Sequence, residues 1–223
     1  MSKMLFALPF VALALTAAKP ADAPAAAAPK ISLNAPAEIA ADPANRLNIA
    51  LSNGGTVVIQ LRPDVAPNHV RRIQQLVTQG FYNGTVFHRV IPGFMAQGGD
   101  PTGTGEGDSP LPDLAPEFND LPHLRGVLSM ARTQDPNSAN SQFFIMFAPT
   151  FSLDHDYTGF GRVVSGMQFV DAIAPGEPPA QPTKIVRAWL DGPMPAAVAE
   201  APPAAPATEP APPPPAEAPA TGG

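Results

Sequence analysis

Between residues 46 and 191 the sequence consists of short apolar runs separated by glycine and proline residues. Runs of this length, rich in valine, isoleucine and phenylalanine, are typical of β-strands rather than of long helices. Antiparallel strands joined by short turns form sandwiches and barrels, whereas a parallel sheet needs a crossover helix between its strands. We therefore expect a mainly β fold, a closed antiparallel barrel with helical plugs.

The first two runs predict a hairpin. Apolar residues alternate with polar or small ones over 47–51 and again over 57–59, and Asn-Gly-Gly at 53–55 supplies a tight turn. The remaining strand-like runs are Thr85–Val90, Phe94–Gly98, Gly126–Ala131, Gln142–Phe147, Gly159–Val164 and Thr183–Leu190.

Two other segments have helical spacing. From Pro67 to Gln79 apolar residues recur every three or four positions, Asp64 is a candidate cap, and Gly80 follows the last turn. Apolar residues at 167, 170 and 173 indicate a short second helix.

Residues 1–23 have the layout of a secretory signal peptide. Lys3 precedes an apolar stretch from Met4 to Leu15, and small residues follow, so that cleavage after Ala18 or after Ala23 fits the pattern. The apolar stretch is shorter than the roughly 20 residues that a membrane-spanning helix needs. A buried or frayed N-terminal helix is the alternative interpretation.

The segments that flank the strand-rich region have the composition of linkers. Residues 24–45 are rich in alanine and proline, and residues 192–223 are almost entirely proline, alanine, glutamate and threonine. We expect a linker at 24–45, one folded domain at 46–191, and a disordered tail at 192–223 with local polyproline II character. The tail is a solvated spacer in the simplest interpretation. The alternatives are a ligand for a proline-binding module and a cell-wall spacer.

Composition excludes several functional classes. The net charge of −6 argues against a nucleic-acid partner, and no basic cluster is present for stable attachment to a membrane surface. The absence of cysteine rules out disulfides and thiolate catalysis, and the four histidines lack the spacing of a zinc site. The glycine-rich run at 98–110 lacks the lysine of a phosphate-binding loop, and a calcium site at Asp100, Glu106 and Asp108 would lack EF-hand spacing. We expect no metal and no cofactor.

Arg89 is the most distinctive candidate for chemistry. It lies in the sequence VFHRVIPGFMAQGGD, where strict alternation places Phe87 and Arg89 on one face, and Gln97 follows across the turn at 92–93. An arginine stays charged at working pH, so an apolar site holds it only with polar partners. A solvated strand arginine is the alternative, but the neighbouring Phe, Met and Gln side chains favour a functional site.

Four sequence blocks resemble the cyclophilin peptidyl-prolyl isomerases. They are FHRVIPGFMAQGGD at 87–100, GVLSMA at 126–131, NSQFFI at 140–145 and FGRVVSGM at 160–167. Their order and spacing also match, and the resemblance covers residues 46–191. It implies a closed eight-stranded antiparallel barrel capped by two α-helices.

The resemblance also implies a site. Arg89 is then the catalytic arginine, assisted by Gln97. The implied proline pocket is formed by Phe94, Met95, Phe144 and Leu153. The other implied substrate-binding residues are Gln142, Tyr157, the backbone near Ala131 and Arg132, and Gly103 and Thr104 at the edge of the groove.

The chain departs from the family pattern at a few positions. Tyr157 stands where many members carry histidine, and a tyrosine at this position is similar to bacterial members. Arg132 stands where asparagine is common. Ser152 stands where many eukaryotic members carry tryptophan, with Phe151 next to it. The loss of this indole predicts weak inhibition by cyclosporin.

Together these features predict an exported bacterial peptidyl-prolyl cis-trans isomerase that assists the folding of exported proteins. We expect a monomer in the periplasm, with a secreted form as the alternative, acting on proline-containing polypeptides without a covalent intermediate. Two other functions use the same features: a proline-binding or chaperone module with negligible turnover, and a scaffold whose tail recruits a partner.

Overall fold

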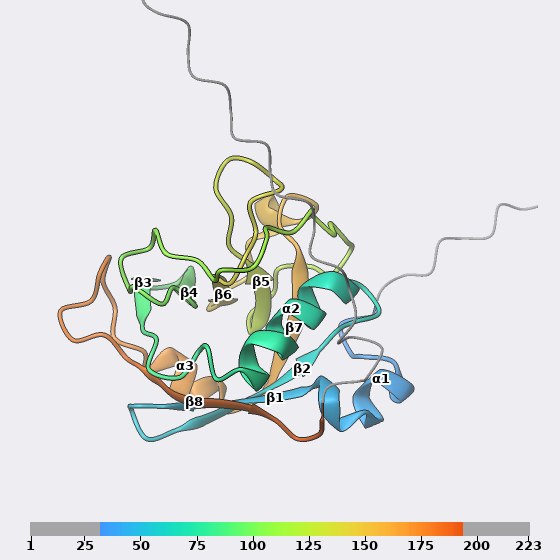
Figure 1. Cartoon of the computed structure of the whole chain (residues 1–223), viewed down its shortest axis with the longest axis horizontal. Helices are drawn as coiled ribbons and strands as arrows, with labels where there is room; N and C mark the ends of the chain where they lie inside the picture. The colour runs from blue at the N-terminus through green and yellow to red at the C-terminus, as the bar shows by residue number, and fades with distance from the viewer. Residues whose placement is uncertain (1–31, 194–223) are drawn as a thin grey trace, which may run out of the picture. The chain divides into compact units, whose positions relative to one another are not determined.

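The computed structural model describes residues 32–193, which belong to one compact unit (Figure 1). The predicted signal peptide lies outside the described residues, as do residues 24–31 of the linker and residues 194–223 of the tail. None of the helices within 32–193 is long and apolar enough to cross a membrane. The strands are β1 (Arg46–Leu51), β2 (Thr56–Leu61), β3 (Phe87–Ile91), β4 (Met95–Gly98), β5 (Val127–Met130), β6 (Phe143–Met146), β7 (Gly159–Ser165) and β8 (Ile185–Leu190).

All eight strands belong to one antiparallel sheet with the order β3-β4-β6-β5-β7-β2-β1-β8. Every predicted strand is present, and the mainly β fold is confirmed. The predicted hairpin is β1–β2, in which Leu47 is opposite Ile59 and Ile49 is opposite Val57. The alternation therefore placed the buried face of this hairpin correctly.

The prediction of a closed barrel is wrong, because the sheet is a curled half-barrel that is open between β3 and β8. These two edge strands form no ladder with each other: an isolated bridge between Val86 and Lys184 and a few backbone hydrogen bonds connect them only where both begin. The outer edge of β3 pairs instead with the segment after the last helix, since Val90 and Gly176 exchange two backbone hydrogen bonds of 2.8 and 3.0 Å. The backbone groups needed for closure at this point are therefore already occupied.

The two predicted helices are α2 (Pro67–Thr78) and α3 (Met167–Asp171). The buried side of α2 carries Val70, Ile73, Leu76 and Val77, which is the set of apolar positions that predicted the helix. Gly80 follows with a φ of +71°, a backbone conformation that suits glycine at a helix end. α2 packs against β8 and shares the main core with the sheet.

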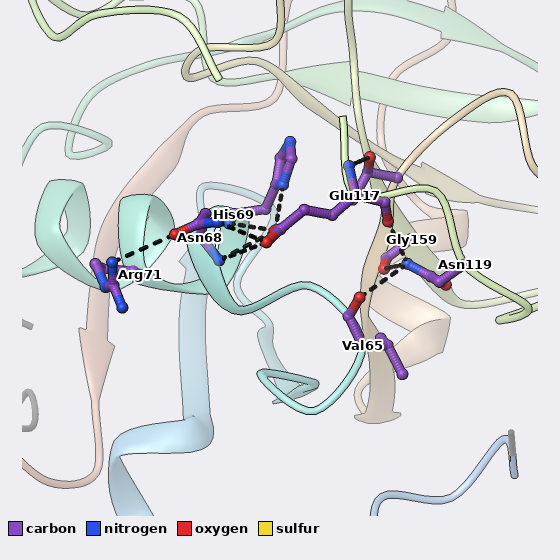
Figure 2. Close-up of polar contacts among 8 residues, drawn as sticks. Val65, Asn68, His69, Arg71, Glu117, Asn119 and Gly159 are labelled. Carbon is purple, nitrogen blue, oxygen red and sulfur yellow. Dashed lines mark hydrogen bonds and ion pairs between the residues drawn. The ribbon is translucent and has the colours of Figure 1, made fainter. Parts of the chain in front are cut away.

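The cap of α2 differs from the prediction. Asp64 pairs with the buried Arg62 instead, and the N-cap position, Ala66, offers no side-chain acceptor. The acceptor comes from a distant segment. The Glu117 carboxylate accepts hydrogen bonds from the backbone N–H groups of Asn68 and His69 at 3.0–3.1 Å (Figure 2). It also accepts from the Asn68 amide and lies 2.7 Å from His69 Nδ1. A carboxylate at this end of a helix is favourable because it satisfies free donors and faces the positive end of the helix dipole.

Residues 32–45 were predicted as linker, and they contain a short helix α1 (Ala37–Ala41) and a 3₁₀ turn η1 (Pro43–Asn45). The Asp42 side chain accepts a 2.9 Å hydrogen bond from Ala44 N, and Gln60 on β2 donates to the carbonyl oxygen of Asn45 at 3.2 Å. These contacts attach the segment to the start of the sheet.

Two hydrophobic clusters lie on opposite faces of the sheet. The larger one contains the inward-facing residues of the strands together with α2, and it includes Phe87, Phe143 and Phe160. The smaller one covers the other face of β4, β5 and β6. It contains Met95, Leu121, Val127, Ala131, Phe144 and Met146, with Phe94, Leu153 and Tyr157 packed against it. The candidate site lies over this smaller cluster.

Candidate functional site

A β-bulge sets the direction of Arg89. The β3–β4 register shifts between Phe87 and Arg89, so that Phe87 is opposite Gly98 whereas Arg89 is opposite the adjacent residue, Gln97. Adjacent residues on a strand face opposite sides of a sheet, so the two side chains diverge.

The predicted alternation, with Phe87 and Arg89 on one face, is therefore wrong. Phe87 is fully buried and packs edge-to-face on Phe143 in the larger cluster. Arg89 instead joins a row across three strands with Gln97 and Phe144. The bulge thus keeps the aromatic ring in the core and brings the guanidinium to the outer face.

Arg89 stands at the wall of a cavity of about 250 Å³. The cavity is lined by nine residues, all of them predicted site residues: Arg89, Phe94, Met95, Gln97, Ala131, Arg132, Phe144, Leu153 and Tyr157. Phe144 and Met95 are buried and form its apolar lining together with the half-buried Phe94 and Leu153. The residues come from β3, β4, β6 and the three connections β3–β4, β5–β6 and β6–β7, so only the folded sheet brings them together.

A chain of amide groups connects Arg89 to the glycine-rich loop. Arg89 Nη1 donates to Gln97 Oε1 over a long 3.5 Å, and Gln97 Nε2 donates to Gln142 Oε1 at 3.0 Å. Gln142 Nε2 donates in turn to the backbone oxygens of Gly105 and Gly107 at 3.1 and 3.0 Å. Gln142 therefore contacts Gln97 but does not line the cavity beside Arg89. It lines a neighbouring cavity instead.

The glycine-rich loop is ordered by Asp100. This carboxylate is fully buried and accepts hydrogen bonds from Thr102 and from the backbone N–H of Gly105. Burial acts to raise the pKa of Asp100, but these hydrogen bonds outweigh it and lower the pKa to about 2. Asp100 therefore holds the loop backbone in place. No group of three or more metal-ligating side chains occurs within residues 32–193.

The two predicted edge residues lie on the other side of Arg89. Gly103 and Thr104 line a hollow of about 230 Å³ together with Arg89, Gln97 and two residues that the sequence did not indicate, Glu177 and Pro178. Glu177 is paired with Arg89, as Nε donates to Glu177 Oε2 at 2.7 Å. Its contact was not predictable because the two residues are far apart in the sequence.

Arg132 and Tyr157 form one wall of the main cavity. The Arg132 guanidinium lies 4.5 Å from the centre of the Tyr157 ring and donates to the backbone oxygens of Asp156 and Thr133. Tyr157 packs edge-to-face on Phe144 with the ring centres 5.7 Å apart. The side chain of Arg132 is therefore occupied as a structural element of the wall.

His123 packs against Phe144, a lining residue of the cavity. The sequence did not indicate His123 as a site residue. Its ring stacks on Phe144 at 6.3 Å, its Nδ1 lies 2.8 Å from Asp154 Oδ1, and its Nε2 lies 3.0 Å from Ser129 Oγ. Burial lowers the pKa of His123, although the hydrogen bond and charge of Asp154 act to raise it. Its ring is therefore neutral at pH 7.

The contacts of Ser129, His123 and Asp154 have the distances of a catalytic triad, but Ser129 has no exposed surface. A nucleophile must reach its substrate, so this set cannot perform acyl transfer. The cavity is lined by the guanidinium groups of Arg89 and Arg132, one side-chain amide, and apolar or aromatic side chains, and the guanidinium of Arg132 lies over the Tyr157 ring. Such a site is suited to binding and stabilising a conformation of a bound group without transferring protons to it.

Comparisons with known proteins agree with this geometry. The family model for "Cyclophilin type peptidyl-prolyl cis-trans isomerase/CLD" matches residues 46–189. A probable peptidyl-prolyl cis-trans isomerase from Brucella suis is 48% identical over 168 residues, covering 68% of this chain and 85% of that protein. The peptidyl-prolyl cis-trans isomerase ppi1 of Schizosaccharomyces pombe is 41% identical over 145 residues, covering 60% and 92%.

Solved structures give the same result. A cyclophilin from Hirschia baltica superposes with a TM-score of 0.62 at 34% identity, covering 67% of this chain and 74% of that one. A cyclophilin-type isomerase from Cryptosporidium parvum, crystallised in the presence of the dipeptide Ala-Pro, gives 0.60 at 29% identity, covering 65% and 98%. The half-barrel and its outer-face site thus define a prolyl isomerase.

The chain belongs to the cyclophilin family and is a peptidyl-prolyl cis-trans isomerase.

Proposed function

We propose that this isomerase binds Xaa-Pro segments of exported polypeptides in the cavity beside Arg89 and accelerates rotation about the prolyl bond. The observation that carries the proposal is the position of Arg89, a charged donor at the wall of a cavity whose floor is the apolar side chains of Met95 and Phe144. The likeness to an isomerase whose crystal structure was determined in the presence of an Ala-Pro dipeptide supports a proline-containing ligand.

The chemistry follows from the amide bond. Its rotation barrier of about 18–20 kcal/mol arises from resonance that draws the nitrogen lone pair into the bond. In the twisted state this lone pair is localised and can accept a hydrogen bond, which neither planar form offers. A donor such as Arg89 therefore binds the twisted state more strongly than either ground state, which is the condition for catalysis.

Arg89 alone does not account for an enzymatic rate. An acceleration of roughly five decades requires about 7 kcal/mol. One charged hydrogen bond contributes about 1.5–3 kcal/mol, or about 3–4 kcal/mol when it is preorganised in a dry site. The apolar cavity supplies the remainder by holding the proline ring and removing water from the adjacent carbonyl. Since no bond is broken, the reaction needs no base, nucleophile, metal or cofactor.

The test is cis/trans exchange of an Ala-Pro peptide, measured by NMR with wild type, Arg89→Ala and Arg125→Ala. Arg125 is a matched control because it is also an exposed arginine in an ion pair, with Asp171, outside the cavity. We expect Arg89→Ala to lose at least about a hundredfold in rate, corresponding to one preorganised donor, and Arg125→Ala to match wild type. Equal rates for wild type and Arg89→Ala would remove Arg89 from the mechanism.

The location of the enzyme is inferred from the sequence of residues 1–23. A charged start, an apolar stretch and small residues before a cleavage point are the pattern of export across the bacterial inner membrane. Expression of the full chain followed by cell fractionation and N-terminal sequencing tests this. Mature protein beginning after Ala18 or Ala23 in the periplasmic fraction is the expected result, and uncleaved protein in the cytoplasm would contradict it.

A further inference from the structure

Arg89 has a second polar partner that the family resemblance did not indicate. Its Nε donates to Glu177 Oε2 at 2.7 Å, a distance typical of a strong charge-assisted hydrogen bond. Glu177 lies on the segment between α3 and β8, which also lines the hollow beside Arg89. This contact makes Glu177 the nearest carboxylate to the proposed catalytic donor.

The backbone fixes Glu177 in this place. Val90, the residue after Arg89, exchanges two hydrogen bonds with Gly176, the residue before Glu177. Gly176 has a φ of +142°, and a Cβ there would lie 2.6 Å from Pro179 Cα, so only glycine fits. The far end of the segment is held by Thr183, which accepts from Phe87 N at 3.0 Å and from Ala174 N at 3.1 Å.

The two partners of Arg89 hold different sides of its guanidinium. Glu177 binds Nε at 2.7 Å and Gln97 lies 3.5 Å from Nη1, so the short contact to Glu177 is the stronger restraint. Among the described residues Nη2 has no hydrogen-bond partner, which leaves it free to donate to a bound peptide. Because the guanidinium is planar, contacts at Nε and Nη1 also fix the direction of Nη2.

We infer that Glu177 is a positioning residue of the isomerase, which orients Arg89 so that its free donors point at the prolyl nitrogen in the main cavity. The inference rests on the proposed role of Arg89. Glu177 lines the adjacent hollow and is not among the lining residues of the main cavity. It acts by reducing the number of conformations that Arg89 samples before the transition state forms.

A carboxylate beside a cationic donor has an opposite effect as well, because it offsets part of the positive charge. The two side chains are 42% and 51% exposed, so water and salt screen this through-space effect strongly. Screening does not remove the orienting effect of the hydrogen bond in the same way, because that effect depends on direct contact. The orienting effect therefore exceeds the neutralising one, and removal of Glu177 lowers activity.

The experiment compares wild type, Glu177→Ala and Glu177→Gln, with Asp171→Asn as a matched control and Arg89→Ala as a reference. Asp171 forms an equally exposed arginine pair outside the cavity, with Arg125 at 2.6 Å. Peptide exchange by NMR gives kcat and KM, and the 15N–1H signal of Arg89 Nε reports its hydrogen bond. Thermal unfolding shows whether each variant is folded.

Glu177→Ala is expected to reduce kcat about fivefold, the upper range for a partly exposed pair, with KM unchanged within about twofold. The Arg89 Nε signal should shift upfield or broaden. Glu177→Gln keeps an acceptor without the charge, so it should retain more than half of the activity. Asp171→Asn should match wild type in every readout.

The outcomes distinguish the role of Arg89 from that of Glu177. If Arg89→Ala keeps wild-type activity, the proposed function of Arg89 fails. If Arg89→Ala is inactive and folded Glu177→Ala keeps wild-type kcat, the positioning role alone is overturned. An increase of kcat in Glu177→Ala also overturns it, because the carboxylate would then restrain the arginine.

Discussion

His123 shows how a single buried side chain can organise the floor of the site. It stacks on Phe144 while its two ring nitrogens contact Asp154 and Ser129, which belong to different segments. Asp154 directly follows Leu153, so the same contact fixes the loop that supplies one wall of the cavity. The neutral ring thus ties together three parts of the site.

The lowered pKa of His123 predicts a specific pH dependence of stability. Because its folded pKa lies below its unfolded value of about 6.5, the unfolded chain binds the proton first. The free energy of unfolding should therefore decrease as the pH falls below about 6.5. His88, whose pKa burial also lowers, acts in the same direction.

The measurement is urea unfolding of wild type and His123→Asn between pH 7.5 and 5. Asparagine can still donate to Asp154 but does not titrate. The pH slope should be smaller in the variant by at most about 1.4 kcal/mol per pH unit, the limit for one proton. Identical slopes would show that the pKa of His123 is the same in the folded and unfolded states, which would contradict the prediction.

Ser152 predicts weak inhibition by cyclosporin. It is exposed on the short 3₁₀ turn η2 (Phe151–Leu153), one residue before Leu153 of the cavity. A tryptophan there would add a large apolar surface and an N–H donor next to the site. Ser152→Trp should therefore lower the inhibitory concentration in a peptide exchange assay at least about tenfold, the effect of burying part of one aromatic side chain. Nanomolar inhibition of wild type would contradict the prediction.

At the level of elements, the cap of α2 is supplied by tertiary structure. Glu117 comes from a loop about fifty positions further along the chain and accepts hydrogen bonds from Asn68 and His69 (Figure 2). Burial acts to raise the pKa of Glu117, but these hydrogen bonds outweigh it and lower the pKa. The ionised carboxylate therefore stabilises the folded state.

Glu117→Ala should decrease the free energy of unfolding at pH 7 by about 2 kcal/mol, and Glu117→Gln by less, because the amide keeps one acceptor. The contribution is present above the unfolded pKa of about 4.3 and is lost as the pH falls through the lower folded pKa. Chemical unfolding at pH 7 and pH 3 measures both effects. Glu38→Gln, at an exposed position on α1, is the control. A loss of the same size for the control variant would contradict the capping role.

The strands and α2 were predictable because their signals are local. Alternation over 47–51 and 57–59 and helical spacing over 67–79 each depend on neighbouring residues. The bulge at Phe87–Arg89, the Glu117 cap and the Arg89–Glu177 pair were not predictable, since each depends on which distant segment lies opposite. The closed barrel failed for the same reason: the partner of the β3 edge is a loop that has no strand pattern.

The candidate site was predictable as a set, although not in its geometry. The family resemblance implied twelve site residues, and the structure brings nine of them around one cavity. It separates Gly103 and Thr104 into an adjacent hollow on the other side of Arg89. Strand register decides this division, and a motif does not encode register.

At the scale of the whole molecule, the end of the last strand contacts the first strand of the domain. β8 ends at Leu190, and Asp191 completes the edge by donating its N–H to Arg46 O at 3.1 Å and accepting from Asn48 Nδ2 at 2.7 Å. Gly192 lies against Pro43, where a Cβ would come within 2.8 Å of the proline ring. Within residues 32–193, Asp191 and Gly192 thus attach the end of β8 to the start of the domain.

Deletion of residues 193–223 should accordingly leave the melting temperature within about 2 °C of wild type, less than the shift expected for 1 kcal/mol in a domain of this size. The rate of Ala-Pro peptide exchange should also be unchanged. A matched deletion of residues 191–223 removes the Asp191 contacts as well and should lower the melting temperature. A loss of peptide exchange on removing residues 193–223 alone, with unfolding unchanged, would show that the tail takes part in catalysis.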